Sequence, residues 1–87
     1  MPKSVFTDEY AALLATLVSA RKAAGMTQAE LSARLGRPQP FISYVERGER
    51  RVDVVEFYAI ALALGHDPID LFSEVVGKFP KSGQPRV

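Results

Sequence analysis

The chain has 87 residues, of which 47% are hydrophobic and 24% charged, and its formal net charge is +1 at pH 7. This length allows one small domain with a single core, and the composition argues against a chain that is disordered throughout. With 0 cysteines, a disulfide framework and a thiolate metal site are excluded, and a reducing compartment such as the cytoplasm is favoured.

The sequence lacks the apolar run that a signal peptide or a membrane-spanning helix needs. Its first ten residues are MPKSVFTDEY, and no apolar stretch of about 18 residues follows. We therefore expect a soluble protein that does not cross a membrane.

The charge is unevenly distributed along the chain. Residues 21–51 carry a net charge of +4, whereas the remainder carries −3. A basic middle with acidic flanks is typical of a protein that presents one face to a polyanion. An ordinary solvated surface is the alternative.

Residues 7–25 have the pattern of an amphipathic helix. Thr7 is placed to cap it, acidic residues lie in its first turn and basic residues in its last, and Gly25 can end it. The apolar residues that repeat at helical spacing are Tyr10, Leu13, Leu14 and Leu17.

Two short helices are predicted next. Thr27 and Glu30 are spaced as a capping box, and this second helix ends at Gly36. After a tight turn, the stretch PFISYVERG predicts a third helix that ends at Gly48; its residues Ile42 and Val45 are expected to be buried. Two short helices joined by a tight turn form a recognised structural unit.

Two further helices follow, and no strand pattern occurs. Asp53 can cap a helix that ends at Gly65, and Asp67 can cap a last helix with Pro68 in its first turn. The residues expected to be buried on these helices are Phe57, Ile60, Ala61, Leu64, Ile69, Leu71, Phe72 and Val75. We expect an N-terminal arm over residues 1–6, a helical domain over 7–76 and a flexible C-terminal tail over 77–87.

The run GMTQAELSARLGRPQPFISYVERG, residues 25–48, resembles the helix-turn-helix of phage repressor and Cro-type regulators, the XRE family. The resemblance extends over about residues 10–75. It implies an all-α, compact five-helix repressor-like domain containing a helix-turn-helix that binds double-stranded DNA. The matching positions are Gly25, Thr27, Gln28, Glu30, Leu31, Leu35, Gly36, Ile42, Ser43, Glu46, Arg47 and Gly48.

The resemblance implies that a recognition helix over about residues 39–47 enters the major groove. Gln39 is the strongest base reader, because its amide can pair with adenine in a bidentate way. Pro40 departs from the family pattern, and we expect Gln39 to be the cap and Pro40 the first helical residue. The predicted base contacts are Gln39, Pro40, Ser43 and Tyr44.

Other residues are assigned to the DNA backbone or to the fold. The resemblance implies that Arg21 pairs with Glu46 and fixes the angle of the recognition helix. If this pair is buried, it serves the structure and not base reading. The residues predicted to contact phosphate are Gln28, Arg37, Arg47, Arg50 and Arg51.

An enzyme is disfavoured, because the single histidine, His66, has no metal-ligand spacing around it and no phosphate-binding loop occurs. We expect no cofactor and no metal. The helix after Asp53 is apolar nearly all round, which favours a homodimer on a palindromic operator. The predicted dimer surface comprises Val55, Tyr58, Leu62, Val75, Val76 and Phe79.

The sequence therefore predicts a small cytoplasmic, nucleoid-associated transcriptional regulator, a repressor or an autoregulating controller. The alternative is a protein-interaction module, such as an antitoxin-like partner protein, that uses the same fold. Salt-dependent binding to a palindrome separates the first from the second.

Overall fold

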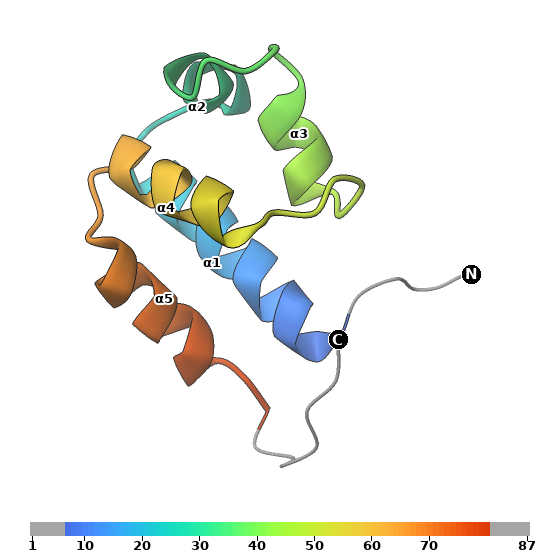
Figure 1. The fold of residues 1–87 in the computed structure, drawn as a ribbon, viewed down its shortest axis with the longest axis vertical. Coiled ribbons are helices and arrows are strands. Elements are labelled where there is room, and N and C mark those ends of the chain that lie inside the picture. Colours follow the sequence, from blue (N-terminus) through green and yellow to red (C-terminus); the bar gives the residue numbers. More distant parts are fainter. Residues whose placement is uncertain (1–6, 81–87) are drawn as a thin grey trace.

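A computed structural model describes residues 7–80 and contains five α-helices and no strand within that range. In Figure 1, α1 runs diagonally through the molecule, α4 lies in front of it, and α5 lies below and to the left of it. The short helices α2 and α3 lie together at one end. The elements are α1 (Asp8–Ala23), α2 (Gln28–Arg34), α3 (Phe41–Glu46), α4 (Val54–Ala63) and α5 (Pro68–Gly77).

Four of the five helices begin at a side-chain cap, as predicted. The Thr7 side chain accepts from the Tyr10 N–H, and the Asp67 side chain accepts from the first turn of α5. Thr27 and Glu30 form the expected capping box at α2. Asp53 caps α4 within a second capping box whose other member, Glu56, was not foreseen. These caps satisfy donors that would otherwise lack a partner at the helix starts.

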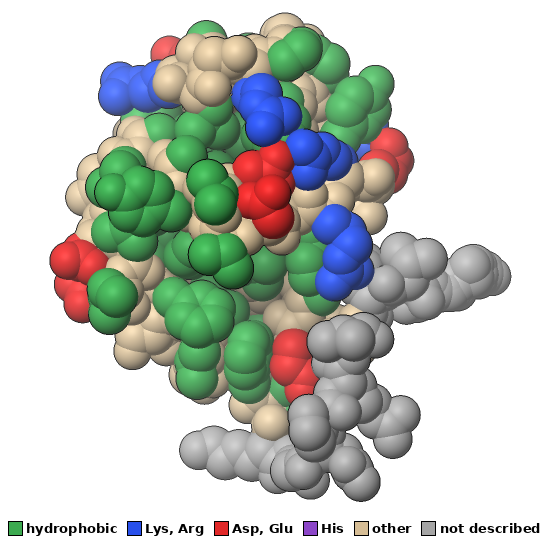
Figure 2. Space-filling model, in the orientation of Figure 1, with side chains coloured by type: hydrophobic (Ala, Val, Ile, Leu, Met, Phe, Trp, Pro, Cys, Tyr) green, Lys and Arg blue, Asp and Glu red, His purple; other side chains and the backbone are tan. Residues whose placement is uncertain are grey.

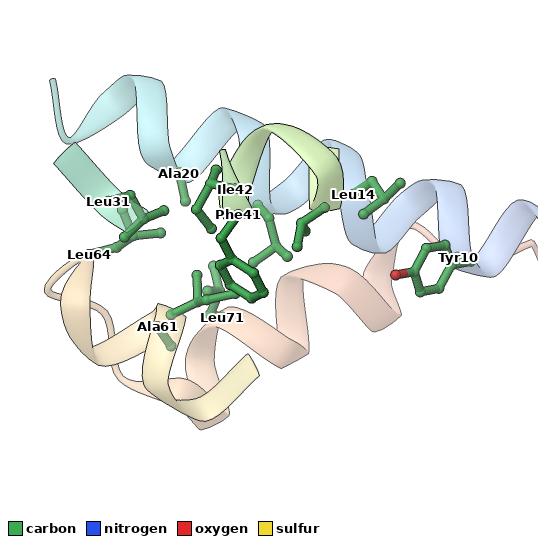
Figure 3. Packing of buried hydrophobic residues seen from close by; sticks show 12 residues of the cluster. Tyr10, Leu14, Ala20, Leu31, Phe41, Ile42, Ala61, Leu64 and Leu71 are labelled. Atoms are coloured by element: carbon green, nitrogen blue, oxygen red, sulfur yellow. The ribbon is translucent and has the colours of Figure 1, made fainter. Parts of the chain in front are cut away.

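The core is formed where the five helices converge, and Figure 3 shows its side chains pointing toward one another. The predicted stripes of the first four helices are largely confirmed, with Leu13 and Phe57 only partly buried. The buried hydrophobic residues are Tyr10, Leu14, Leu17, Ala20, Leu31, Phe41, Ile42, Val45, Ile60, Ala61, Leu64, Leu71 and Val75.

The prediction for α5 was wrong at two residues. Ile69 is 79% exposed and Phe72 is 50% exposed, although both were expected to be buried. Leu71 and Val75, one turn apart, form the face that α5 buries. Ile69 and Phe72 lie on another face of the same helix, where the Phe72 and Phe57 rings form a T-shaped pair at a centroid distance of 5.8 Å.

The C-terminal helix continues one residue beyond the predicted domain end, to Gly77. Lys78, which was assigned to the tail, donates from Nζ to the buried Thr16 Oγ1 on α1 at 2.8 Å. The predicted arm, residues 1–6, and residues 81–87 of the predicted tail lie outside the described residues. None of the helices within residues 7–80 combines the length and apolar character needed to cross a membrane.

Candidate nucleic-acid interface

The helix α3 has one buried and one outward face. Phe41, Ile42 and Val45 are buried in the core. Gln39 and Tyr44 are exposed. Ser43 is half-buried beside them. The helix is therefore anchored by Ile42 and Val45, as the sequence predicted, and its outward side chains lie at the surface.

The predicted start of α3 was wrong by one residue. Pro40 occupies the N-cap position with φ −86° and ψ 6°, and Phe41 is the first helical residue. The Phe41 N–H donates to the Pro38 carbonyl at 2.9 Å, which closes a turn over Gln39 and Pro40. The first helical bond runs from the Tyr44 N–H to the Pro40 carbonyl. Gln39 thus belongs to the turn, and it is exposed there.

A hydrogen bond to the uncharged side chain of Ser32 on α2 replaces the side-chain cap that Pro40 cannot supply. Ser32 is fully buried, and its Oγ accepts from the Ile42 N–H at 3.0 Å. The Arg37 N–H donates to the Ser32 carbonyl at 3.0 Å. One residue of α2 therefore fixes both the turn and the start of α3. Ser32 was not among the predicted residues, although a serine next to Leu31 on the inner side of a short helix was a visible signal.

The far end of α3 is held by a buried carboxylate. Glu46 accepts two bonds from Arg21, at 2.7 Å from Nε and 3.1 Å from Nη2. The Arg21 and Glu46 side chains are only 10% and 9% exposed. Arg21 also donates from Nη1 to the Met26 carbonyl at 2.8 Å. The structure thus brings the expected pair together and links α1, the turn after it and α3.

Gln28, a predicted phosphate contact, is joined to the same carboxylate. Its Nε2 donates to Glu46 Oε1 at 2.7 Å. An amide nitrogen carries two hydrogens, so one donor and the amide oxygen are not used by this bond. The start of α2 and the end of α3 are therefore held at a fixed separation.

A glycine turns the chain after α3 and brings an arginine-rich loop back to this helix. Gly48 has φ 78°, a backbone conformation that favours glycine. The Glu49 and Arg50 N–H groups both donate to the Tyr44 carbonyl. Arg47 donates to Ser43 Oγ and Glu49, and its guanidinium lies 5.1 Å from the Tyr44 ring centroid.

Two predicted phosphate contacts converge on Glu56 of α4. Arg50 donates to Glu56 from Nη1 at 3.0 Å and from Nη2 at 2.6 Å, and Arg37 donates from Nη2 at 3.0 Å. Both guanidinium groups lie against the Phe41 ring, 4.5 Å from its centroid for Arg37 and 5.3 Å for Arg50. The structure therefore groups Arg37, which precedes α3, with Arg50 and Glu56, which follow it, around the first residue of α3.

The charges in this group favour one another's ionised state. The Arg50 guanidinium, and after it the Asp53 backbone N–H, hold the pKa of Glu56 below its ordinary value of 4.5. Glu56 in turn raises the pKa of Arg50 above its ordinary value. Glu30 in the other capping box also has a lowered pKa, but there the main causes are the backbone and the side chain of Thr27.

The side chain of Arg51, the last predicted phosphate contact, packs against α1 and not against α3. Its guanidinium is 4.1 Å from the centroid of the Tyr10 ring. The Tyr10 hydroxyl accepts from the Val52 N–H at 3.1 Å. Tyr10 thus ties the loop between α3 and α4 to the first helix, a role that its membership in an apolar stripe did not reveal.

The predicted dimer surface is largely exposed, with one error. Val55, Tyr58, Leu62 and Val76 are 73%, 55%, 52% and 46% exposed. Val75 is 0% exposed and cannot belong to an outer surface, because its side chain packs in the core. Phe79 is half-buried.

The exposed apolar residues extend beyond the predicted set. Figure 2 shows hydrophobic side chains gathered over α4 and α5, with basic side chains toward α3. A groove of about 360 Å³ lies between these two helices and is almost wholly apolar. Its lining residues are Leu13, Val52, Val54, Phe57, Tyr58, Pro68, Ile69 and Phe72.

Comparisons with known proteins place this geometry in context. A family model described as helix-turn-helix matches residues 17–71. An XRE-family like protein from Pseudomonas syringae pv. tomato has a similar solved structure, with a TM-score of 0.76 and 51% identity over 83% of this chain and 88% of that chain. The clp gene regulator ClgR from Corynebacterium glutamicum has a TM-score of 0.74 and 27% identity, over 88% of this chain and 100% of that chain.

A curated relative has a similar sequence. The chain is 41% identical to an uncharacterized HTH-type transcriptional regulator, y4dJ, of Sinorhizobium fredii over 51 residues. The match covers 59% of this chain and spans 66% of that relative's length.

Proposed function

We propose how this chain, which belongs to the XRE family of DNA-binding helix-turn-helix regulators, binds DNA. Its helix α3 enters the major groove of a double-stranded operator. One observation carries the proposal: the exposed face of α3 is polar, and arginines flank it at both ends. In this arrangement α2 lies across the DNA backbone. The protein acts on DNA in the cytoplasm.

Base reading is assigned to the turn and the outward face of α3. Gln39, exposed before the helix, offers an amide that both donates to and accepts from adenine. Ser43 and Tyr44 follow it on the same side, and the Ser43 hydroxyl is held by Arg47. Pro40 has no N–H to donate, so its part in the contact is apolar.

Backbone binding is assigned to Gln28, Arg37, Arg47, Arg50 and Arg51. Gln28 keeps a second amide hydrogen for a phosphate while it bonds to Glu46. The arginines are each paired with a carboxylate or an aromatic ring, yet the side chains of Arg37, Arg47 and Arg50 remain 40%, 52% and 42% exposed. Such contacts position the protein and contribute affinity that falls with salt.

A homodimer through α4 and α5 supports the use of a palindrome. Val55, Tyr58 and Leu62 share the outer side of α4, and Val76 extends this apolar surface on α5. A two-fold interface places the same patch of each subunit against its copy. Paired recognition helices then meet half-sites about 34 Å apart. Phe79 belongs at the edge of this surface, since it is half-buried.

Selection of bound duplexes from a random pool tests the proposal. We expect enrichment of a palindromic consensus, binding that weakens as salt increases, and a dimer in sedimentation experiments. A dimer that enriches no duplex even at low salt would instead support the antitoxin-like or other protein-interaction module. Repression or autoregulation is then tested with a reporter whose promoter carries the selected operator.

A further inference from the structure

The carboxylate of Glu56 lies between two arginines that the proposed function assigns to DNA phosphates. Its side chain is only 12% exposed, whereas those of Arg37 and Arg50 are 40% and 42% exposed. The carboxylate itself is fixed from a third direction, because Glu56 Oε1 accepts from the Asp53 N–H at 3.0 Å. Glu56 is thus a rigid, largely covered acceptor beneath two accessible cations.

The bonds to Glu56 leave both guanidinium groups able to bind a second anion. Glu56 engages one nitrogen of Arg37 and two nitrogens of Arg50, and Arg50 Nη1 also donates to the Arg51 carbonyl. A guanidinium carries five N–H donors, so each arginine keeps donors that these bonds do not use. The ring of Phe41 supports both groups from one side. Each arginine can therefore stay on Glu56 and contact a phosphate with its remaining donors.

This arrangement has opposite consequences for two kinds of DNA binding. Non-specific binding uses any arginine conformation that reaches a phosphate, so a carboxylate that restrains two arginines and offsets their charge weakens it. Specific binding needs the arginines in one geometry, and restraining them beforehand lowers the entropy cost of forming that complex. Both effects raise the ratio of specific to non-specific affinity.

We infer that Glu56 is a positioning residue for DNA specificity: it holds Arg37 and Arg50 on Phe41 so that they meet the backbone in the register of the operator. This inference rests on the proposed DNA binding of α3. It assigns to an acidic residue of α4 a part in recognition, although the residue reads no base.

The variant Glu56→Gln tests the inference while keeping the helix cap. Glutamine can also complete a capping box, so α4 retains its start. We expect binding to a scrambled duplex to become about threefold to fivefold tighter, with a salt slope steeper by about 1. Binding to the selected operator should change less, so the specificity ratio falls.

Glu30→Gln is the matched control, because it removes the same charge from the same position of the other capping box. Within residues 7–80, no arginine is hydrogen-bonded to the Glu30 carboxylate, which accepts from the Thr27 N–H. We expect this variant to tighten the operator and the scrambled duplex by a similar factor and to leave their ratio unchanged. A Glu56→Gln protein that behaves in the same way would overturn the inference.

Glu56→Asp separates positioning from charge. The shorter side chain keeps the negative charge but does not reach both arginines in the observed geometry, so we expect a lower specificity ratio, with non-specific binding tightened less than in Glu56→Gln. A wild-type ratio in this variant would overturn positioning in favour of charge alone. If the unmodified protein binds no duplex in a salt-dependent way, the proposed function fails; if it binds and the variants keep its ratio, only the present inference fails.

Discussion

Two carboxylates lie near the two ends of α3, and they differ mainly in how deeply their arginine partners are buried. Glu46 joins Arg21 and Gln28 inside the protein, where both members of the ion pair are about nine-tenths covered. Glu56 joins Arg37 and Arg50 at the surface, where the arginines remain accessible. The same chemistry therefore has two uses: a buried pair fixes the helix in the fold, and a surface cluster orients arginines that the proposed function assigns to the DNA backbone.

The largest expected effect on stability comes from breaking the buried Arg21–Glu46 pair. Glu46→Gln leaves the Arg21 guanidinium buried without its charge partner, so we expect a loss of about 3–5 kcal/mol in the free energy of unfolding. Urea denaturation measures it. The double variant Arg21→Met with Glu46→Leu should recover much of the loss, since it leaves no uncompensated charge. A single-variant loss as small as that of a surface pair would contradict the buried role.

Two serine variants test whether the surface cluster of Arg37, Arg50 and Glu56 also fixes the start of α3. Ser32→Ala leaves the Ile42 N–H without its acceptor, and we expect a loss of about 1–3 kcal/mol in unfolding free energy. Ser43→Ala on the outward face is the matched control and should change stability by about 0.5 kcal/mol or less. Equal losses in the two serine variants would mean that the surface cluster, and not Ser32, fixes this end of the helix.

Gln39→Ala sharpens the comparison between base reading and backbone positioning at this same end. We expect a loss of about 1–3 kcal/mol of discrimination at one base pair of the operator, because an amide that pairs with one base is removed. Arg50→Ala should instead weaken the operator and all of its single-base variants alike and reduce the salt slope by about 1. Binding to a set of single-base operator variants over a salt series measures both. A uniform loss in Gln39→Ala would show that Gln39 reads no base.

Local signals predicted much of this architecture. The five helices follow from apolar periodicity. Most of their caps follow from a capping residue that lies within four positions of the N–H group it satisfies. The start of α3 was misplaced by one residue because two prolines surround Gln39, and sequence rules do not decide which of them ends the turn. Ile69 and Phe72 were wrongly expected to be buried, because periodicity identifies an apolar face but not whether a neighbour covers it.

The ion pairs around α3 were harder to predict, because their members come from separate elements. The Arg21–Glu46 pair was expected only through the family resemblance, since 25 residues separate its members. Glu56 lies 19 residues from Arg37 and 6 from Arg50, and its spacing from Asp53 predicts a helix cap but no arginine partner. Only the packing of α4 against the α2–α3 turn brings these charges together. The base and phosphate assignments themselves stay predictions until DNA binding is measured.

The smallest expected effect is the acid sensitivity of the surface cluster. Because the pKa of Glu56 is lowered in the folded protein, its ionised form contributes stability that is fully present above its ordinary value of 4.5 and is lost as the pH falls through the lower folded value. The stability difference between the unmodified protein and Glu56→Gln should therefore be constant near neutral pH and shrink below 4.5. Thermal unfolding over a pH series measures it. Glu30 titrates in the same range but is present in both proteins, so its contribution cancels. A stability difference that persists unchanged below the folded pKa would show that the charge of Glu56 contributes nothing to the fold.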